Sequence, residues 1–206
     1  MNPLLIRRRG MMQAQQGGLP YDAEIEFLKA TGGAYIVLPH GISGDTDFSC
    51  DGIIPSASSN RFLLGSADGW EVSHVMLGSA GTSNYYLRYG TSATAQIIRT
   101  YAAFDIRHTF SKNGLVYKWG NYTVTGTNFT KTIQKTFLFA GTSNGIDPLN
   151  PGVNTTIYNF FMSDNDYQVD LIPVRVGTVG YMYDRVSGQL FGNSGTGDFV
   201  LGPDVQ

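Results

Sequence analysis

The segment from Asp170 to Asp204 limits the fold of this chain more than any other. Apolar and aromatic side chains recur there at every second position, as at Val179, Tyr181 and Tyr183, which is the period of a β-strand. Extended runs joined by tight turns predict an antiparallel β-sheet. The turn-forming residues of the segment are Gly177, Ser187-Gly188, Asn193 and Gly195-Thr196-Gly197.

The same pattern continues through the rest of the chain from Leu19 onward, and no segment shows a convincing helical period. Many short strands with frequent turns predict two packed antiparallel sheets, which is a β-sandwich or jelly roll. We expect strands at Glu24–Leu28, Tyr35–Leu38, Asp47–Ile54, Arg61–Ser66, Glu71–Leu77, Tyr85–Tyr89, Ala95–Thr100, Asp105–Ser111, Leu115–Trp119, Lys135–Ala140, Thr156–Ser163, Gln168–Arg175, Thr178–Asp184 and Asp198–Leu201.

The clearest local signal is a hairpin around Asn113-Gly114. Both residues tolerate positive φ, and extended runs flank them, so a two-residue turn with Asn113 and Gly114 at its centre is expected. A longer loop is expected between Ser143 and Gly152, because Pro148 and Pro151 cannot occupy a central strand.

Composition agrees with one β-rich domain. The 206 residues include 26 Gly, 12 Phe and 12 Tyr, whereas charged residues make up only 15%. A chain of this length buries roughly 70% of the surface that its unfolded form exposes, which supports a core without disulfides. Cys50 is the only cysteine, so no intrachain disulfide is expected.

Charge and hydropathy exclude several partners. A net charge of −2 gives no general attraction to nucleic acid or acidic membranes, and no apolar run reaches the roughly 20 residues that cross a bilayer. Leu4–Ile6 is too short for a secretory signal, and Arg7–Arg9 follow it rather than precede it. We therefore expect a protein made and retained in a cytoplasm, without nucleic-acid or membrane partners.

Residues 1–18 differ from the rest of the chain, because they contain adjacent arginines, two methionines and a glutamine-rich stretch. We expect an extended N-terminal arm that a partner orders, followed by one domain over residues 19–206. Arginine suits carboxylate-rich protein surfaces, and methionine fits adaptable apolar grooves. A solvated tail is the alternative. The expected anchoring residues are Leu4, Leu5, Ile6, Arg7, Arg8, Arg9, Met11 and Met12.

Two segments resemble one known family. The opening segment, Tyr21–Ile42, resembles the first strand pair of concanavalin A-like or laminin-G-like jelly-roll domains of gut bacteriophages and their hosts. The end of the chain resembles the closing strands of the same domains. The matching residues are Glu26-Phe27-Leu28, Ala30-Thr31-Gly32 and Tyr35-Ile36 in the first segment, and Val169–Arg175, Gly180–Asp184 and Phe191–Gly197 in the second.

This resemblance implies an all-β, two-sheet antiparallel jelly roll whose first and last strands lie near one another. It also implies a module of virion fibres or surface proteins, a group to which glycan binding is often ascribed. Fold alone does not establish function, so these remain expectations.

Glycan binding by a jelly roll uses exposed aromatic rings beside amide or carboxylate groups. Packing in the core or between subunits is the alternative for each such ring. The candidate glycan-binding residues are Trp70, Tyr85, Tyr86, Trp119 and Tyr122.

Catalysis is the weaker hypothesis. Asp22, Glu24 and Glu26 alternate, so one face of a strand could present all three carboxylates. A glycosidase needs two carboxylates facing a scissile bond across an aromatic cleft, whereas these residues lie where the resemblance places an ordinary first strand. We expect no enzyme activity and no catalytic residue.

No cofactor is expected either. Asp45, Asp47 and Asp51 could supply oxygen ligands to Ca²⁺, but no closing glutamate follows, and aspartate-rich turns are common. The histidines at positions 40, 74 and 108 lack partners at zinc-ligand spacing. The calcium question stays open at this point.

Two functions fit the sequence. The first is a non-enzymatic bacteriophage virion protein, a head-fibre, decoration or tail-fibre subunit assembled in the bacterial cytoplasm, whose arm binds capsid or tail proteins. We expect such a subunit to form a homotrimer and to display a lectin-like domain to host glycans. The alternative is a free bacterial carbohydrate-binding module.

Overall fold

The computed structural model describes residues 18–56, 61–69, 73–80, 84–90, 96–100, 104–126, 135–142, 144–151 and 154–206. Every strand pair in these segments is antiparallel, and no helix occurs in them. None of the described segments forms a helix that could span a membrane. The predicted all-β class is therefore correct.

The strands are short and follow one another closely. They are β1 (Ala23–Glu24), β2 (Leu28–Ala30), β3 (Ile36–Leu38), β4 (Asp47–Ile53), β5 (Arg61–Gly69), β6 (Ser73–Ala80), β7 (Asn84–Gly90), β8 (Gln96–Thr100), β9 (His108–Asn113), β10 (Val116–Trp119), β11 (Tyr122–Thr125), β12 (Thr136–Leu138), β13 (Gly141–Thr142), β14 (Pro148–Leu149), β15 (Thr156–Ser163), β16 (Gln168–Val176), β17 (Val179–Asp184), β18 (Leu190–Phe191) and β19 (Phe199–Leu201).

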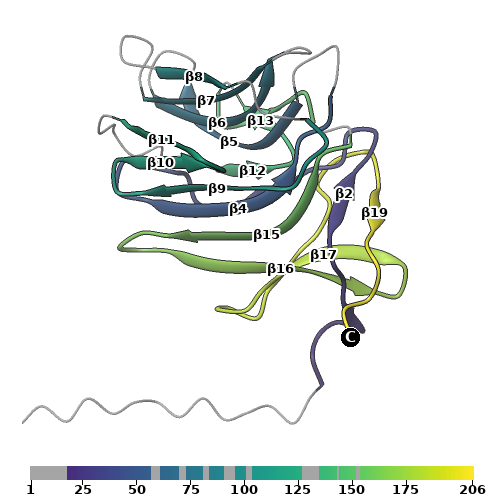
Figure 1. Ribbon diagram of the computed structural model, residues 1–206. Coiled ribbons are helices and arrows are strands. Elements are labelled where there is room, and N and C mark those ends of the chain that lie inside the picture. Colours follow the sequence, from purple (N-terminus) through teal and green to yellow (C-terminus); the bar gives the residue numbers. More distant parts are fainter. Residues whose placement is uncertain are drawn as a thin grey trace, which may run out of the picture.

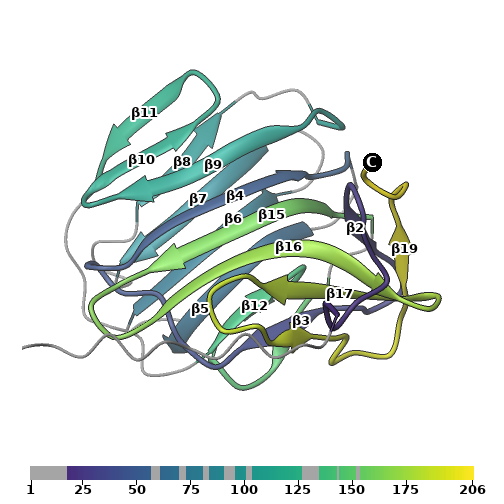
Figure 2. The same cartoon turned by 90° about the horizontal axis from the view of Figure 1, so that it is seen from below.

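Two sheets pack face to face, as Figure 1 shows from the side. The large sheet has eleven strands, and its main path runs β11-β10-β9-β4-β15-β16-β17-β18, with β1, β2 and β19 attached at one end. The small sheet has six strands in the order β3-β12-β5-β6-β7-β8. Figure 2 views the large sheet from outside, with the small sheet behind it. The expected two-sheet antiparallel sandwich is confirmed.

The core lies between the sheets and follows from the two-residue period of each strand. In β4, Phe48 and Cys50 are buried, whereas Asp47, Ser49 and Asp51 point away from the small sheet and are partly exposed. Burial also raises the pKa of the Cys50 thiol well above its ordinary value, which keeps it protonated and unreactive.

The two ends of the domain meet, as the family resemblance implied. Strand β19 pairs with β2, and an isolated bridge joins Ile25 to Asp204. The expected strand Glu24–Leu28 is nevertheless wrong as one element. Residues 23–24 pair with β16, whereas β2 pairs with β15 and β19, so the chain changes partners between them.

The predicted hairpin exists, but its turn is displaced by one residue. Asn113 pairs with Val116, so Gly114 and Leu115 form the turn, and only Gly114 has positive φ. The Gly114 N–H donates to the Asp47 carboxylate at 2.7 Å. This contact with the neighbouring strand holds the turn in its register and is invisible in the local sequence.

Other differences arise at strand ends. Strand β9 begins at His108 rather than Asp105, because Asp105 has φ of 61°, which breaks an extended run. Strand β11 and the two-residue strands β13, β14 and β18 are absent from the prediction, since their sequences are too short or too polar to show alternation. Strand β13 lies just before the loop expected between residues 143 and 152, and its partner β14 lies within that loop.

Candidate functional site

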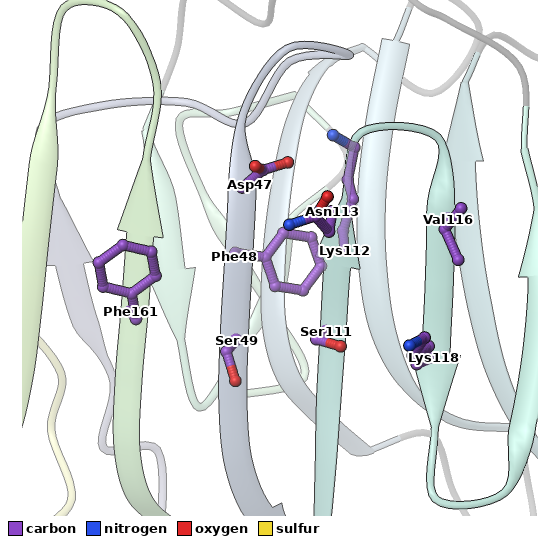
Figure 3. Close-up of a pocket in the computed structure, with 9 residues that line it drawn as sticks. All are labelled: Asp47, Phe48, Ser49, Ser111, Lys112, Asn113, Val116, Lys118 and Phe161. Carbon is purple, nitrogen blue, oxygen red and sulfur yellow. The ribbon is translucent and has the colours of Figure 1, made fainter.

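A row of side chains crosses the outer face of the large sheet, the face directed away from the small sheet. In successive strands Lys118 of β10 lies opposite Ser111 of β9, Ser111 opposite Ser49 of β4, and Ser49 opposite Phe161 of β15. Directly paired residues share one face of a sheet. The four side chains therefore lie side by side, as Figure 3 shows. We call them the cross-strand row.

A hollow of about 520 Å³ lies over this row. We call it the first hollow. Phe161 and Val116, both partly buried, provide its apolar surface. Its remaining lining is Asp47, Phe48, Ser49, Ser111, Lys112, Asn113 and Lys118.

The polar groups of the row are available to a ligand. In the part of the chain that the structure describes, the Ser49 and Ser111 hydroxyls and the Lys118 ammonium have no hydrogen-bond or ion-pair partner. A serine hydroxyl both donates and accepts, and a lysine ammonium donates three hydrogen bonds. An aromatic surface beside such groups suits a ligand with one apolar face and several hydroxyls.

A buried lysine holds the rim of the first hollow. Lys112 is 1% exposed, and its ammonium donates to the backbone oxygens of Gly44 and Thr46, both at 2.6 Å. Burial lowers the pKa of Lys112, and the nearby carboxylates of Asp47 and Asp45 oppose this change. The ammonium thus fixes the loop that leads into β4 and hence the position of Asp47.

The same loop is tied to the β15–β16 turn. The Thr46 hydroxyl donates to the Asp164 carboxylate at 3.2 Å, and His40 Nε2 lies 2.7 Å from the same oxygen. The His40 ring also stacks on Tyr167 with 4.6 Å between ring centres. Rigid support of this kind prepares a binding surface without an ordering cost.

A second hollow, of about 490 Å³, lies on the same face, and Tyr158 and Asn159 form part of its lining. We call it the second hollow. Its arginines are already bound. Arg107 donates through two nitrogens to Asp51, at 2.9 and 2.6 Å, and its guanidinium lies 3.7 Å from the centre of the Tyr158 ring. Arg185 donates through two nitrogens to Asp170. Both guanidinium groups are therefore already bound by carboxylates of the protein.

The predicted aromatic residues do not form one site. Trp119 is 6% exposed and packs against Phe110 in the core, so little of its ring faces outward. Tyr122 is 50% exposed but pairs with Trp119, which places it on the side opposite the cross-strand row. Trp70 and the side chains of Tyr85 and Tyr86 lie outside the described residues. The anchoring residues between Leu4 and Met12 also lie outside them.

The three carboxylates considered for catalysis do not project from one strand. Asp22 accepts the Gly177 N–H at 2.6 Å, and Glu24 accepts the Tyr21 hydroxyl at 3.0 Å. Glu24 and Glu26 line the second hollow. Asp22 is absent from the lining of that hollow, and Glu26 lies beyond the end of β1 at Glu24.

Two of the three aspartates considered for calcium, Asp47 and Asp51, are engaged separately. Asp51 binds Arg107, Asp47 binds the Gly114 N–H, and the carbonyls of Gly44 and Thr46 accept from Lys112. The described residues contain no group of three or more histidine, cysteine, aspartate or glutamate side chains placed to hold a metal ion.

Sequence reasoning missed Phe161, Ser49, Ser111 and Lys118. Phe161 occurs next to Phe160 in a mostly apolar run, and the serines are ordinary strand residues. The two-residue period does predict that Phe160 and Phe161 face opposite sides of their strand. It does not predict which strands adjoin β15.

No protein-family model matches this sequence, and no curated protein matches it. The fold is similar to the crystal structure of a protein from Bacteroides ovatus ATCC 8483 to which carbohydrate binding has been ascribed. The TM-score is 0.52 and the sequence identity 8%, over 89% of this chain. This chain spans 62% of the length of that protein. The likeness concerns the fold, which is an all-β sandwich.

Proposed function

We propose that this protein is a non-enzymatic, lectin-like module that binds carbohydrate in the first hollow. The observation that carries the proposal is the cross-strand row, in which hydroxyl and ammonium groups without a partner among the described residues lie beside the exposed part of Phe161. Sugar rings have apolar faces and polar edges, and this surface complements both. The carbohydrate binding ascribed to the Bacteroides protein adds support at the level of fold.

Binding to a glycan array, followed by calorimetry on the best ligand, tests the proposal. We expect Phe161→Ala to weaken binding at least about tenfold, or about 1.4 kcal/mol, with the fold retained by circular dichroism. Tyr122→Ala is the matched control, because Tyr122 is an exposed aromatic on the opposite face of the adjacent hairpin. Equal losses in both variants, or binding lost only with Tyr122→Ala, would place the site elsewhere.

The non-enzymatic part of the proposal needs its own test. Glu24 and Glu26 both line the second hollow, which makes them the carboxylates to examine for hydrolysis. We expect no release of reducing sugar from any bound glycan. Turnover that disappears in Glu24→Gln or Glu26→Gln would instead establish a glycoside hydrolase.

We further propose that the module is displayed on a bacteriophage particle by its N-terminal arm, which binds capsid or tail proteins. The arrangement of the domain supports display. β1 pairs with the end of β16 near Arg175, and Asp204 bridges to the adjoining Ile25. Asp47, at the rim of the first hollow, pairs with Ser163, next to the start of β16 at Gln168. The hollow thus lies toward the end of the sandwich away from β1 and Asp204.

Deletion of residues 1–18 tests the anchoring proposal in particles assembled in the bacterial host. The truncated protein should keep its melting temperature and glycan binding but fail to co-sediment with particles. Replacement of Arg7, Arg8 and Arg9 by alanine should weaken attachment in the same direction. Full occupancy of particles by the truncated protein would exclude anchoring and favour a free bacterial module.

Light scattering tests the proposed homotrimer.

A further inference from the structure

The first hollow contains a lysine, Lys118, whose ammonium has no ion-pair partner among the described residues, and this bears on the class of saccharide it takes. Among the described residues, three ionisable side chains line it, namely Asp47, Lys112 and Lys118. Lys112 is buried and directs its ammonium at backbone oxygens, so a ligand cannot bind it directly. Asp45 and Asp47 lie close enough to Lys112 to act on its charge. Lys112 is therefore engaged within the protein, whereas the Lys118 ammonium has no ion-pair partner in the part of the chain that the structure describes.

Lys118 is exposed and stands at one end of the cross-strand row, with Phe161 at the other. Neighbouring strands are about 4.8 Å apart, so three strand spacings separate these residues by roughly 14 Å at the backbone. The Ser111 and Ser49 side chains lie on the two strands between them, as Figure 3 shows. This length suits a short oligosaccharide that stacks on Phe161 and extends to the ammonium.

The second hollow differs from the first in its charges, because its cations are already paired. Its two arginines are bound by Asp51 and Asp170, and Glu24 and Glu26 also line it. An anionic group placed there would meet carboxylates rather than a free cation. Of the two hollows, as the described residues form them, the first therefore offers an anionic substituent the more favourable position, at Lys118.

We propose, building on the carbohydrate-binding function above, that the first hollow selects saccharides carrying an anionic group, and that Lys118 determines this selectivity. A lysine ammonium is a compact point charge that attracts both carboxylate and sulfate substituents. The shared chemistry is a negatively charged sugar, from either uronic acids or sulfated sugars. Phe161 and the two serines bind the sugar rings, whereas Lys118 discriminates among them.

Calorimetry with matched ligand pairs tests the selectivity. One pair is an oligogalacturonate and its fully methyl-esterified form, and the other is a sulfated galactose oligosaccharide and its unsulfated form. We expect the wild type to bind at least one anionic member about tenfold more tightly than its neutral partner. The pair that shows the difference distinguishes carboxylate from sulfate. The preference should weaken with added salt, because Lys118 is exposed.

Variants then assign the preference to one residue. Lys118→Gln should bind the anionic and neutral members equally, and Lys118→Arg should retain the preference. Lys135→Gln is the charge-matched control, because Lys135 is exposed and adjoins β12 of the small sheet. A preference that survives Lys118→Gln, or equal binding of both members by the wild type, would overturn the inference.

These outcomes are distinct from failure of the proposed function. If neutral and anionic sugars bind equally and Phe161→Ala weakens both, carbohydrate binding stands and the charge selectivity is wrong. If no saccharide binds, the proposed function fails first. Duplex DNA that binds as tightly as the sugars and is unaffected by Phe161→Ala would also overturn the assignment, by showing general attraction to polyanions.

Discussion

The two hollows on the outer face of the large sheet have similar volumes but opposite states of pairing. In the second hollow, Arg107 binds Asp51 and Arg185 binds Asp170, each through two guanidinium nitrogens. In the first, the Lys118 ammonium and the serine hydroxyls have no partner among the described residues. Charged residues that satisfy one another hold the sheet together, whereas unpaired ones are free to bind a ligand.

This difference explains why arginine count is a poor guide to the binding site here. The second hollow is richer in charged side chains, yet a ligand there must first displace internal ion pairs. A polar group already hydrogen-bonded within the protein gains little from exchanging one partner for another. The less charged hollow is the better candidate.

The largest expected effect is a loss of stability, and it distinguishes the buried face of β15 from its outer face. Phe160→Ala removes a fully buried ring from the core and should lower the free energy of unfolding by about 3–5 kcal/mol. Phe161→Ala, one residue away, should cost much less stability but weaken sugar binding. Urea denaturation and calorimetry on both variants measure the contrast. Similar stability losses in the two variants would show that Phe161 is a core residue rather than a binding surface.

The next largest effect is a loss of stability at Asp184, which lies beside residues of the second hollow. The buried Asp184 carboxylate accepts the N–H groups of Asp170, Val186 and Ser187, and the Ser187 hydroxyl. Asp184→Asn replaces one accepting oxygen by a donor, and should cost about 1–3 kcal/mol of stability. Thermal and urea unfolding test this, with exposed Asp198→Asn as the control of equal charge change.

The stability difference between the wild type and Asp184→Asn should depend on pH, because the Asp184 carboxylate titrates only in the wild type. Burial opposes its ionisation, but the hydrogen bonds from Asp170, Ser187 and Val186 outweigh burial and place the pKa below the usual 3.8. A lowered folded pKa means that the stabilisation is complete above the unfolded value and is lost as the pH falls through the folded one. The wild type should therefore lose its advantage over Asp184→Asn below about pH 4. A constant difference down to pH 2 would contradict this.

A smaller effect is expected at the rim of the first hollow. Lys112→Met keeps the buried stem but leaves the Gly44 and Thr46 carbonyls without their donor. The cost of those unpaired oxygens is partly offset because an ammonium no longer has to be buried, so we expect a net loss of about 1–2 kcal/mol. Urea denaturation measures it against Lys135→Met. A more stable variant would show that burial of the ammonium dominates.

The smallest effect should come from the exposed ion pair of the second hollow. Arg107→Ala removes the bond to Asp51 and the stacking on Tyr158, and should cost at most about 1 kcal/mol, because exposed ion pairs are screened by solvent. Anionic sugars should bind the variant as they bind the wild type. A large loss of binding would transfer the site to the second hollow and overturn the comparison.

Much of the architecture could be predicted from local patterns. Alternation in β4 and β16 and the residues of the turns indicated strands, an all-β class and a sandwich. The candidate site could not be predicted in the same way. Trp119 was a reasonable aromatic candidate, but pairing of its strand with β9 directs it into the core beside Phe110.

Sequence by itself determined where the chain extends and turns, because alternation and turn preference act over a few neighbouring residues. Only the tertiary structure decided which strands adjoin. Lys118, Ser111, Ser49 and Phe161 come from four separate strands, and they form one row because long-range pairing sets β10, β9, β4 and β15 side by side in a single register. A shift of one residue in any pairing would turn a member of the row into the core.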